Sequence, residues 1–188
     1  MTTETKRQII HIILCAPAFL FKYLSRWQAA TLVLFILVIV LAVVPHSKLK
    51  FHLYRLEETK YSYGAIMYFF AILFLILCFP LFIAAAGLVV LALGDGLATL
   101  VGQHFKTKKM PWNQNKSYAG TTAFILGSFL GIVIILHWFR PDLGKNFVYL
   151  VALKTAMIVA IVESLPWKIN DNISVPIASA LLLNLMVS

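Results

Sequence analysis

The sequence contains few acidic residues and very little cysteine. It has 7 Asp and Glu against 16 Lys and Arg, and its two cysteines are Cys15 and Cys78. Both cysteines lie in apolar runs, and no CxxC pair or His/Cys cluster is present, so neither a disulfide framework nor a zinc site is expected. The sequence also lacks a GxxxxGK[ST] motif, which argues against a P-loop nucleotide site.

Apolar residues dominate the composition. They make up 61% of the 188 residues, and the mean hydropathy is +0.90. A soluble domain is only roughly half apolar. The formal net charge of +9 comes from basic residues that lie mainly in short connections between apolar runs. There they set membrane topology and attract anionic headgroups or polyphosphates, so we expect a polytopic membrane protein and no nucleic-acid partner.

The lengths of the apolar runs predict the architecture. A helix of about 20 apolar residues crosses a bilayer. Apolar runs of roughly this length predict an all-α bundle of about seven membrane segments. Together they would form one integral membrane domain over residues 1–188. The predicted segments are 9–21, 27–44, 61–79, 81–105, 118–139, 146–162 and 173–187.

The distribution of basic residues predicts the orientation. Seven crossings place the termini on opposite sides of the membrane. The N-terminal side carries eleven basic residues, which are Lys6, Arg7, Lys48, Lys50, Arg55, Lys60, Lys106, Lys108, Lys109, Lys116 and Lys168. The other side carries four, which are Lys22, Arg26, Arg140 and Lys145. The positive-inside rule then predicts that the N-terminus and the polar motifs near it are cytosolic.

Three carboxylates are embedded in apolar segments or flush with them. They are Asp95, Glu163 and Asp171. A charge at that depth costs roughly 2.5–3.5 kcal/mol on insertion scales, so such a residue usually faces a polar cavity or a cation. An ion pair with Lys154 or a loop lysine is the structural alternative. Asp95 stands between two glycines, which would allow an unwound or closely approached backbone.

Two polar stretches offer groups that bind phosphate and metal. NKSYAGTT, residues 115–122, places Lys116 and several hydroxyls at the start of an apolar segment, where helix N–H groups favour an anion. ESLPWKINDN, residues 163–172, combines two carboxylates with two amides and a lysine, and hard oxygen ligands of this kind suit Mg²⁺. A topology-anchoring lysine and an ordinary polar turn are the alternatives.

The N-terminal stretch KRQIIHII, residues 6–13, contains a third candidate. Its Arg7 and His11 are spaced i, i+4 and therefore share one helical face. A basic pair at the membrane border could bind a lipid headgroup or phosphate. Both residues could equally be anchors that reach the interface.

In order along the chain, KRQIIH, GDGLATLVGQHF, NKSYAGTT and ESLPWKINDN resemble the CTP-dependent polyprenol, phytol and diacylglycerol kinases, the family that includes dolichol kinase. The resemblance extends from Lys6 to Asn172. It implies a multi-pass membrane enzyme that transfers the γ-phosphate of CTP to a membrane lipid alcohol with a divalent metal, Mg²⁺.

The resemblance also implies roles for individual residues. Asp95, Lys116 and Asp171 would be catalytic, and Glu163 would join the two aspartates at the metal. The residues expected at the nucleotide or phosphate are Lys116, Ser117, Gly120, Thr121 and Asn172, and those expected at the substrate headgroup are Arg7 and His11.

The chain departs from the family pattern at two points. Ala119 stands where family members often have an acidic residue, and Phe105 is followed by Lys106 where Phe-Gly is common. The missing acidic residue at Ala119 bears on either the metal count or the substrate type. Two other functions remain open at this point: a cytidylyltransferase that forms a CDP-lipid, and a small transporter whose intramembrane acids bind ions or protons.

Overall fold

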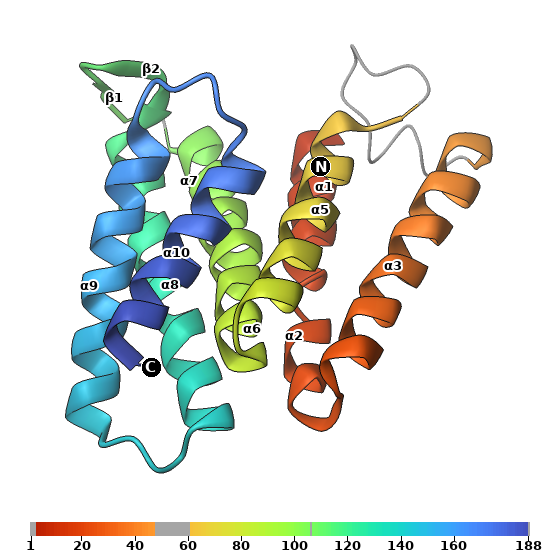
Figure 1. Cartoon of the computed structure of the whole chain (residues 1–188). Coiled ribbons are helices and arrows are strands. Elements are labelled where there is room, and N and C mark those ends of the chain that lie inside the picture. The colour runs from red at the N-terminus through yellow and green to blue at the C-terminus, as the bar shows by residue number, and fades with distance from the viewer. Residues whose placement is uncertain (1–2, 48–60, 106, 188) are drawn as a thin grey trace.

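The computed structural model describes residues 3–47, 61–105 and 107–187 as a bundle of helices with a small β-hairpin at one end (Figure 1). The N-terminal elements are α1 (Thr3–Ile13), α2 (Pro17–Leu20), η1 (Phe21–Tyr23), α3 (Arg26–Val43) and η2 (Val44–His46). The middle of the chain forms α5 (Tyr63–Cys78), α6 (Leu81–Val89), η3 (Val90–Asp95) and α7 (Gly96–His104). The remainder forms β1 (Lys109–Met110), β2 (Asn113–Ser117), α8 (Tyr118–Phe139), α9 (Lys145–Ser164) and α10 (Asp171–Val187).

The predicted class, a helical membrane bundle, is confirmed. Within the described residues, four helices are long and apolar enough to cross a membrane, and they span Arg26–His46, Leu81–His104, Tyr118–Phe139 and Lys145–Ser164. Two shorter apolar helices, α5 and α10, accompany them. Serine side chains start several of these helices. Ser25 accepts a hydrogen bond from the Gln28 N–H at 3.3 Å, and Ser117 accepts one from the Gly120 N–H at 3.2 Å.

The first predicted segment, 9–21, is not one helix. α1 ends at Ile13, and a turn separates it from the four-residue α2, which begins at Pro17. Proline has no N–H to donate to the carbonyl four residues earlier, and its ring clashes with that carbonyl, so the helix cannot continue through Pro17. The prediction missed this break because the segment is apolar throughout.

The stretch before α8, expected to be a loop, is an antiparallel hairpin. Lys109 pairs with Ser117 and Met110 with Asn113, with an irregular register between the two pairs. The hairpin lies at the same end of the bundle as the N-terminus and the α9–α10 connection (Figure 1). Most of the predicted polar connection 46–60, and Lys106, lie outside the described residues.

The central element is the continuous helix formed by α6, η3 and α7. Buried residues make up 72% of its most apolar stretch, against 17% for the stretch centred on α3. It packs against α8 along its length and also against α1, α5 and α10. Small residues permit this close packing: a Cβ added at Gly94 would lie 2.4 Å from the Ser128 hydroxyl oxygen, and one at Gly96 would lie 2.6 Å from Ile12 Cγ1.

The glycines beside Asp95 therefore serve helix packing, and the backbone there is not unwound. The helix instead widens into a π-helix over Val90–Asp95 and continues as α7. A π turn shifts the residues that follow it around the helix axis and is common at functional sites. The carbonyl of Leu91 in this turn accepts a side-chain hydrogen bond from α1, with His11 Nε2 at 3.3 Å.

Candidate active site

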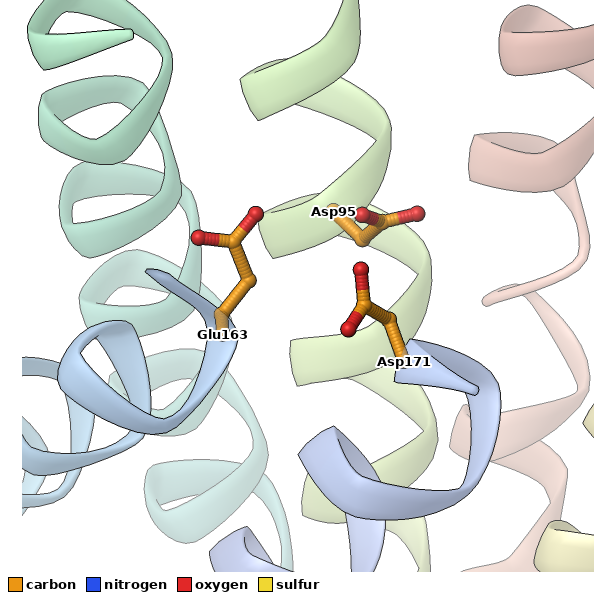
Figure 2. Close-up of side chains that lie close together, drawn as sticks. All are labelled: Asp95, Glu163 and Asp171. Atoms are coloured by element: carbon orange, nitrogen blue, oxygen red, sulfur yellow. The ribbon is translucent and has the colours of Figure 1, made fainter. Parts of the chain in front are cut away.

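Three carboxylates converge where the central helix, α9 and α10 meet. Asp95 ends the π-helix, Glu163 is in the last turn of α9, and Asp171 begins α10. One carboxylate oxygen from each residue lies within 4.8 Å of those from the other two. Figure 2 shows the three side chains pointing toward one another from their separate helices. The three acids that the sequence predicts as metal ligands are thus brought together by the fold.

Lys116 on β2 lies against this cluster. Its Nζ forms ion pairs with Glu163 Oε1 and, at 2.8 Å, with Asp171 Oδ2. Burial by itself would lower the pKa of Lys116, but the negative charges of Glu163 and Asp171 outweigh that effect and raise it above its usual range. The lysine is therefore a permanent cation at neutral pH. The predicted alternative of Lys154 as the partner of Asp95 does not fit, because Lys154 is exposed on α9.

The hairpin holds Lys116 in place by docking on the end of α9. Trp112 Nε1 donates a hydrogen bond to Ser164 Oγ at 3.3 Å, and Asn113 Nδ2 donates to the Ser164 carbonyl at 3.2 Å. Ser164 follows Glu163 directly in sequence. The strand that carries the lysine is thereby fixed to the helix turn that carries its partner.

The start of α10 is tied to α5. Asn170 Oδ1 accepts a hydrogen bond from the Asn172 N–H at 3.0 Å, which caps the helix beside Asp171. The side-chain amide of Asn172 donates to the Gly64 carbonyl at 2.8 Å. Asn172, expected at the phosphate, thus also links the helix of Asp171 to α5.

Asp95 and Asp171 of this cluster, together with Lys116, line a polar cavity of about 740 Å³, whereas Glu163 lines a smaller cavity. The polar cavity is bordered by residues of α1, α5, α7, β2 and the α9–α10 connection. Besides Asp95, Lys116, Asp171 and Asn172, its lining includes Arg7, Gln8, Tyr63, Thr99, Asn113, Asn115 and Trp167. It reaches Asp95 well before the central helix ends at His104, so access to that carboxylate does not require the helix to break.

The residues expected at the phosphate do not all line this cavity. Lys116 and Asn172 do, whereas Ser117, Gly120 and Thr121 line a separate cavity of about 170 Å³ on another side of Lys116. The Ser117 hydroxyl is engaged as the cap of α8. A Cβ at Gly120 would lie 2.9 Å from the Ala98 carbonyl oxygen, so this glycine permits the close contact between α7 and α8.

The two residues expected at the substrate headgroup are placed differently. Arg7 lines the 740 Å³ cavity, whereas His11 lies deeper along α1 and lines a smaller cavity. The His11 ring also lies edge-on to Tyr68, with 5.0 Å between the ring centroids. Arg7 is therefore positioned near the carboxylate cluster, and His11 is part of the packing between α1, the π-helix and α5.

The donor set suits a hard divalent cation. Three carboxylates surround one ammonium group, and the second oxygen of Glu163, Oε2, is buried and accepts no hydrogen bond from any described residue. Buried carboxylate oxygens are normally satisfied by hydrogen bonds or a cation. A polyphosphate would add further negative charge here, which a cation such as Mg²⁺ would offset.

Several cavity residues were missed by the sequence analysis. Gln8 is 5% exposed on α1 and lines the cavity beside Arg7. Asn113 and Asn115 reach it from β2. Gln8 could have been suspected from its place inside the KRQIIH motif. The asparagines become recognisable only once the stretch before Lys116 is known to be a strand of the hairpin.

The fold and the site define a helical protein with four membrane-length helices among the described residues and a polar cavity lined by two carboxylates and a lysine. The chain is 37% identical over 106 residues to a chloroplastic farnesol kinase of Arabidopsis thaliana, covering 53% of this chain and 34% of that protein. It is 37% identical over 131 residues to a phytol kinase of Synechocystis sp., covering 65% and 54%. It is 31% identical over 146 residues to a probable phytol kinase 2 of Glycine max, covering 72% and 49%.

These relatives agree with the resemblance found in the motifs: the chain is similar to the phytol and farnesol kinases. The aligned part of the chain spans between about a third and about half of the length of these relatives. No family model matches the chain, and no solved structure matches it.

Proposed function

We propose that this chain is a lipid-alcohol kinase that uses CTP as phosphate donor and Mg²⁺ as cofactor. The observation that carries the proposal is the convergence of Asp95, Glu163 and Asp171 with Lys116 at the edge of a polar cavity, which both aspartates and the lysine line. The curated relatives named for farnesol and phytol support an alcohol as the acceptor. CTP as donor rests on the resemblance of the four motifs.

The reaction needs positioning and charge stabilisation more than covalent chemistry. The alcohol oxygen attacks the γ-phosphorus of the nucleotide, and the bond from that phosphorus to the β–γ bridging oxygen breaks. CDP leaves with the electrons of that bond, and the hydroxyl proton passes to a carboxylate of the site or to water. The products are a lipid monophosphate and CDP.

The residues of this chain fit distinct parts of that reaction. Asp95, Glu163 and Asp171 would hold Mg²⁺, whose positive charge would offset that of the phosphates. Lys116 would donate hydrogen bonds to phosphate oxygens, and its raised pKa keeps it protonated for this role. Arg7 lines the same cavity and would add a second cation near the phosphates. The hairpin would hold Lys116 in position through its hydrogen bonds to α9.

The test is a label-transfer assay on the purified protein in lipid nanodiscs. CTP labelled at either the α- or the γ-phosphate is supplied with Mg²⁺ and one of farnesol, phytol, a polyprenol, diacylglycerol or phosphatidic acid. A kinase moves the γ-label to an alcohol and releases CDP. ATP, GTP and UTP at the same concentration then determine whether CTP is the preferred donor.

Other results would identify other functions. Transfer of the α-label to phosphatidic acid, with release of pyrophosphate, would show a cytidylyltransferase. Transfer of neither label, together with ion flux that Asp95→Asn abolishes, would show a transporter. The Asp142→Asn variant is the matched control, because it makes the same chemical change in an exposed residue far from the cavity.

A further inference from the structure

A second cavity, of about 180 Å³, lies between α1, α3 and α5. Its lining is mainly apolar. The apolar side chains are Ile10 of α1 with the adjoining Leu14, Val40 of α3 with the adjoining Val44, and Ala65, Tyr68 and Phe69 of α5. We refer to this cavity as the apolar groove. Its mainly apolar lining contrasts with the polar lining of the 740 Å³ cavity.

The apolar groove and the polar cavity meet at the carboxylate cluster. Five residues line both, and they are Arg7, Gln8, Gly64, Asp95 and Asn172. Asp95 is the member of the cluster that belongs to both linings, since Asp171 borders only the polar cavity. A molecule in the apolar groove with a polar group at its inner end would therefore present that group to Asp95.

The outer wall of the apolar groove is the least buried long helix of the protein. α3 packs along α5, and only 17% of its most apolar stretch is buried. Val44 is 5% exposed and Val40 is half-buried, both facing the groove, whereas Val38 is 54% exposed on the same helix. In a membrane, the exposed face of α3 would contact lipid. The groove thus lies directly behind a lipid-facing helix.

We infer that the apolar groove binds the acceptor, a single-chain isoprenoid alcohol, with its hydroxyl at Asp95 and its chain between α1 and α3. This inference rests on the proposed kinase function and adds where its lipid substrate binds. Pockets that bury a drug-sized ligand measure about 300–1,000 Å³, so a cavity of this size accommodates the first isoprene units of one chain. The rest of the chain extends into the bilayer.

The first test compares two tryptophan substitutions on α3. Val40→Trp fills the apolar groove, and Val38→Trp places the same side chain on the exposed face of the same helix. Overfilling a packed site is costly, so Val40→Trp is expected to raise the KM for farnesol by roughly tenfold or more. Its KM for CTP is expected to stay within about twofold of wild type, and Val38→Trp is expected to match wild type throughout.

The second test needs neither turnover nor a variant. Wild-type protein in nanodiscs is irradiated with a farnesol analogue that carries a diazirine near its hydroxyl end, and labelled peptides are identified by mass spectrometry. Labelling is expected in residues 8–14, 40–44 and 64–69, and unmodified farnesol is expected to compete it away. Labelling confined to α8 and α9 would overturn the inference.

The outcomes separate this inference from the function on which it rests. If the wild-type protein phosphorylates no alcohol, the proposed function fails. If the wild type is active and Val40→Trp behaves like Val38→Trp, the kinase stands and the groove does not hold the acceptor. An equal rise in the KM for farnesol and for CTP in Val40→Trp would also overturn the inference, because an obstructed acceptor site spares the nucleotide.

Discussion

Two ion-pair sites at opposite ends of the bundle show how differently the same kinds of side chain can act (Figure 1). At one end Lys116 bridges Glu163 and Asp171, which lie 47 and 55 residues further along the chain. At the other end Arg140 binds Asp142, two residues away, at 2.8 Å. Glu163 is 2% exposed, whereas Asp142 is 59% exposed.

The two sites differ in how far water solvates their charged side chains. Water solvates Arg140 and Asp142 well, so their contact adds little beyond lowering the pKa of Asp142 through the hydrogen bonds from Arg140. In the Lys116 cluster Glu163 is almost fully buried, so its charge depends on the lysine for compensation. The cluster also holds more carboxylates than its lysine can neutralise, which an isolated structural ion pair does not. Matched substitutions at the two sites test this contrast.

The largest expected effect comes from removing one carboxylate charge. Asp95→Asn preserves the shape of the side chain and removes its charge where the polar cavity meets the apolar groove. We expect phosphate transfer to fall by roughly 10²–10³-fold, the range seen when one preorganised electrostatic group is lost. Asp142→Asn should leave the rate unchanged. Label transfer to farnesol measures both, and an Asp95→Asn rate within threefold of wild type would remove Asp95 from the site.

The second-largest effect is expected from removing the lysine, which should lower stability as well as activity. Lys116→Met leaves Glu163 and Asp171 without their cation, and breaking a buried pair in this way costs about 3 kcal/mol or more. Because Asp171 is 37% exposed, the cost should fall at the low end of that range. Thermal unfolding in detergent should show a clear decrease for Lys116→Met and none for Arg140→Met.

A double substitution distinguishes a charge effect from a packing effect in that experiment. Replacing both partners of a buried polar contact is less costly than replacing one. Lys116→Met combined with Glu163→Gln should therefore unfold at a higher temperature than Lys116→Met alone. Additive losses would indicate that Lys116 stabilises the fold through its aliphatic chain.

A smaller effect is expected on the Mg²⁺ concentration that activity requires. Glu163→Gln removes the carboxylate whose Oε2 accepts no hydrogen bond from the described residues, and that oxygen is a free ligand position. The Mg²⁺ concentration that gives half-maximal activity should rise by about tenfold, in line with losses of 10–100-fold from altered metal shells. Titration of Mg²⁺ after EDTA treatment measures this shift. An unchanged midpoint would mean that Glu163 serves only as the partner of Lys116.

The smallest effect concerns the hairpin. Trp112→Phe keeps an aromatic ring and removes the N–H that donates to Ser164, at a cost of about 1 kcal/mol for one hydrogen bond. We expect the KM for CTP to rise by about threefold with little change in the rate at saturation, because Lys116 would be held less firmly. Trp138→Phe removes the indole donor to the Phe19 carbonyl at the other end and should leave the KM unchanged.

Much of the fold could be predicted from the sequence because membrane helices are encoded locally. Apolar length marked the helices, and Pro80 correctly marked the start of the central one. The break before Pro17 and the hairpin of residues 109–117 escaped prediction. The first lies in a run that is apolar on both sides of the proline. The second has little apolar alternation, and it docks on the distant Ser164.

The sequence by itself determined which residues were out of place in a membrane protein. Asp95, Glu163 and Asp171 could be selected because a carboxylate at membrane depth is costly wherever the rest of the chain lies. Only the tertiary structure decided that these acids gather around Lys116. It also decided that Ser117, Gly120 and Thr121 line a different cavity from the two aspartates. It also decided that the glycines around Asp95 pack helices together. The reason is physical: the cost of burying a charge depends on local composition, whereas its compensation depends on side chains that packing brings from distant parts of the chain.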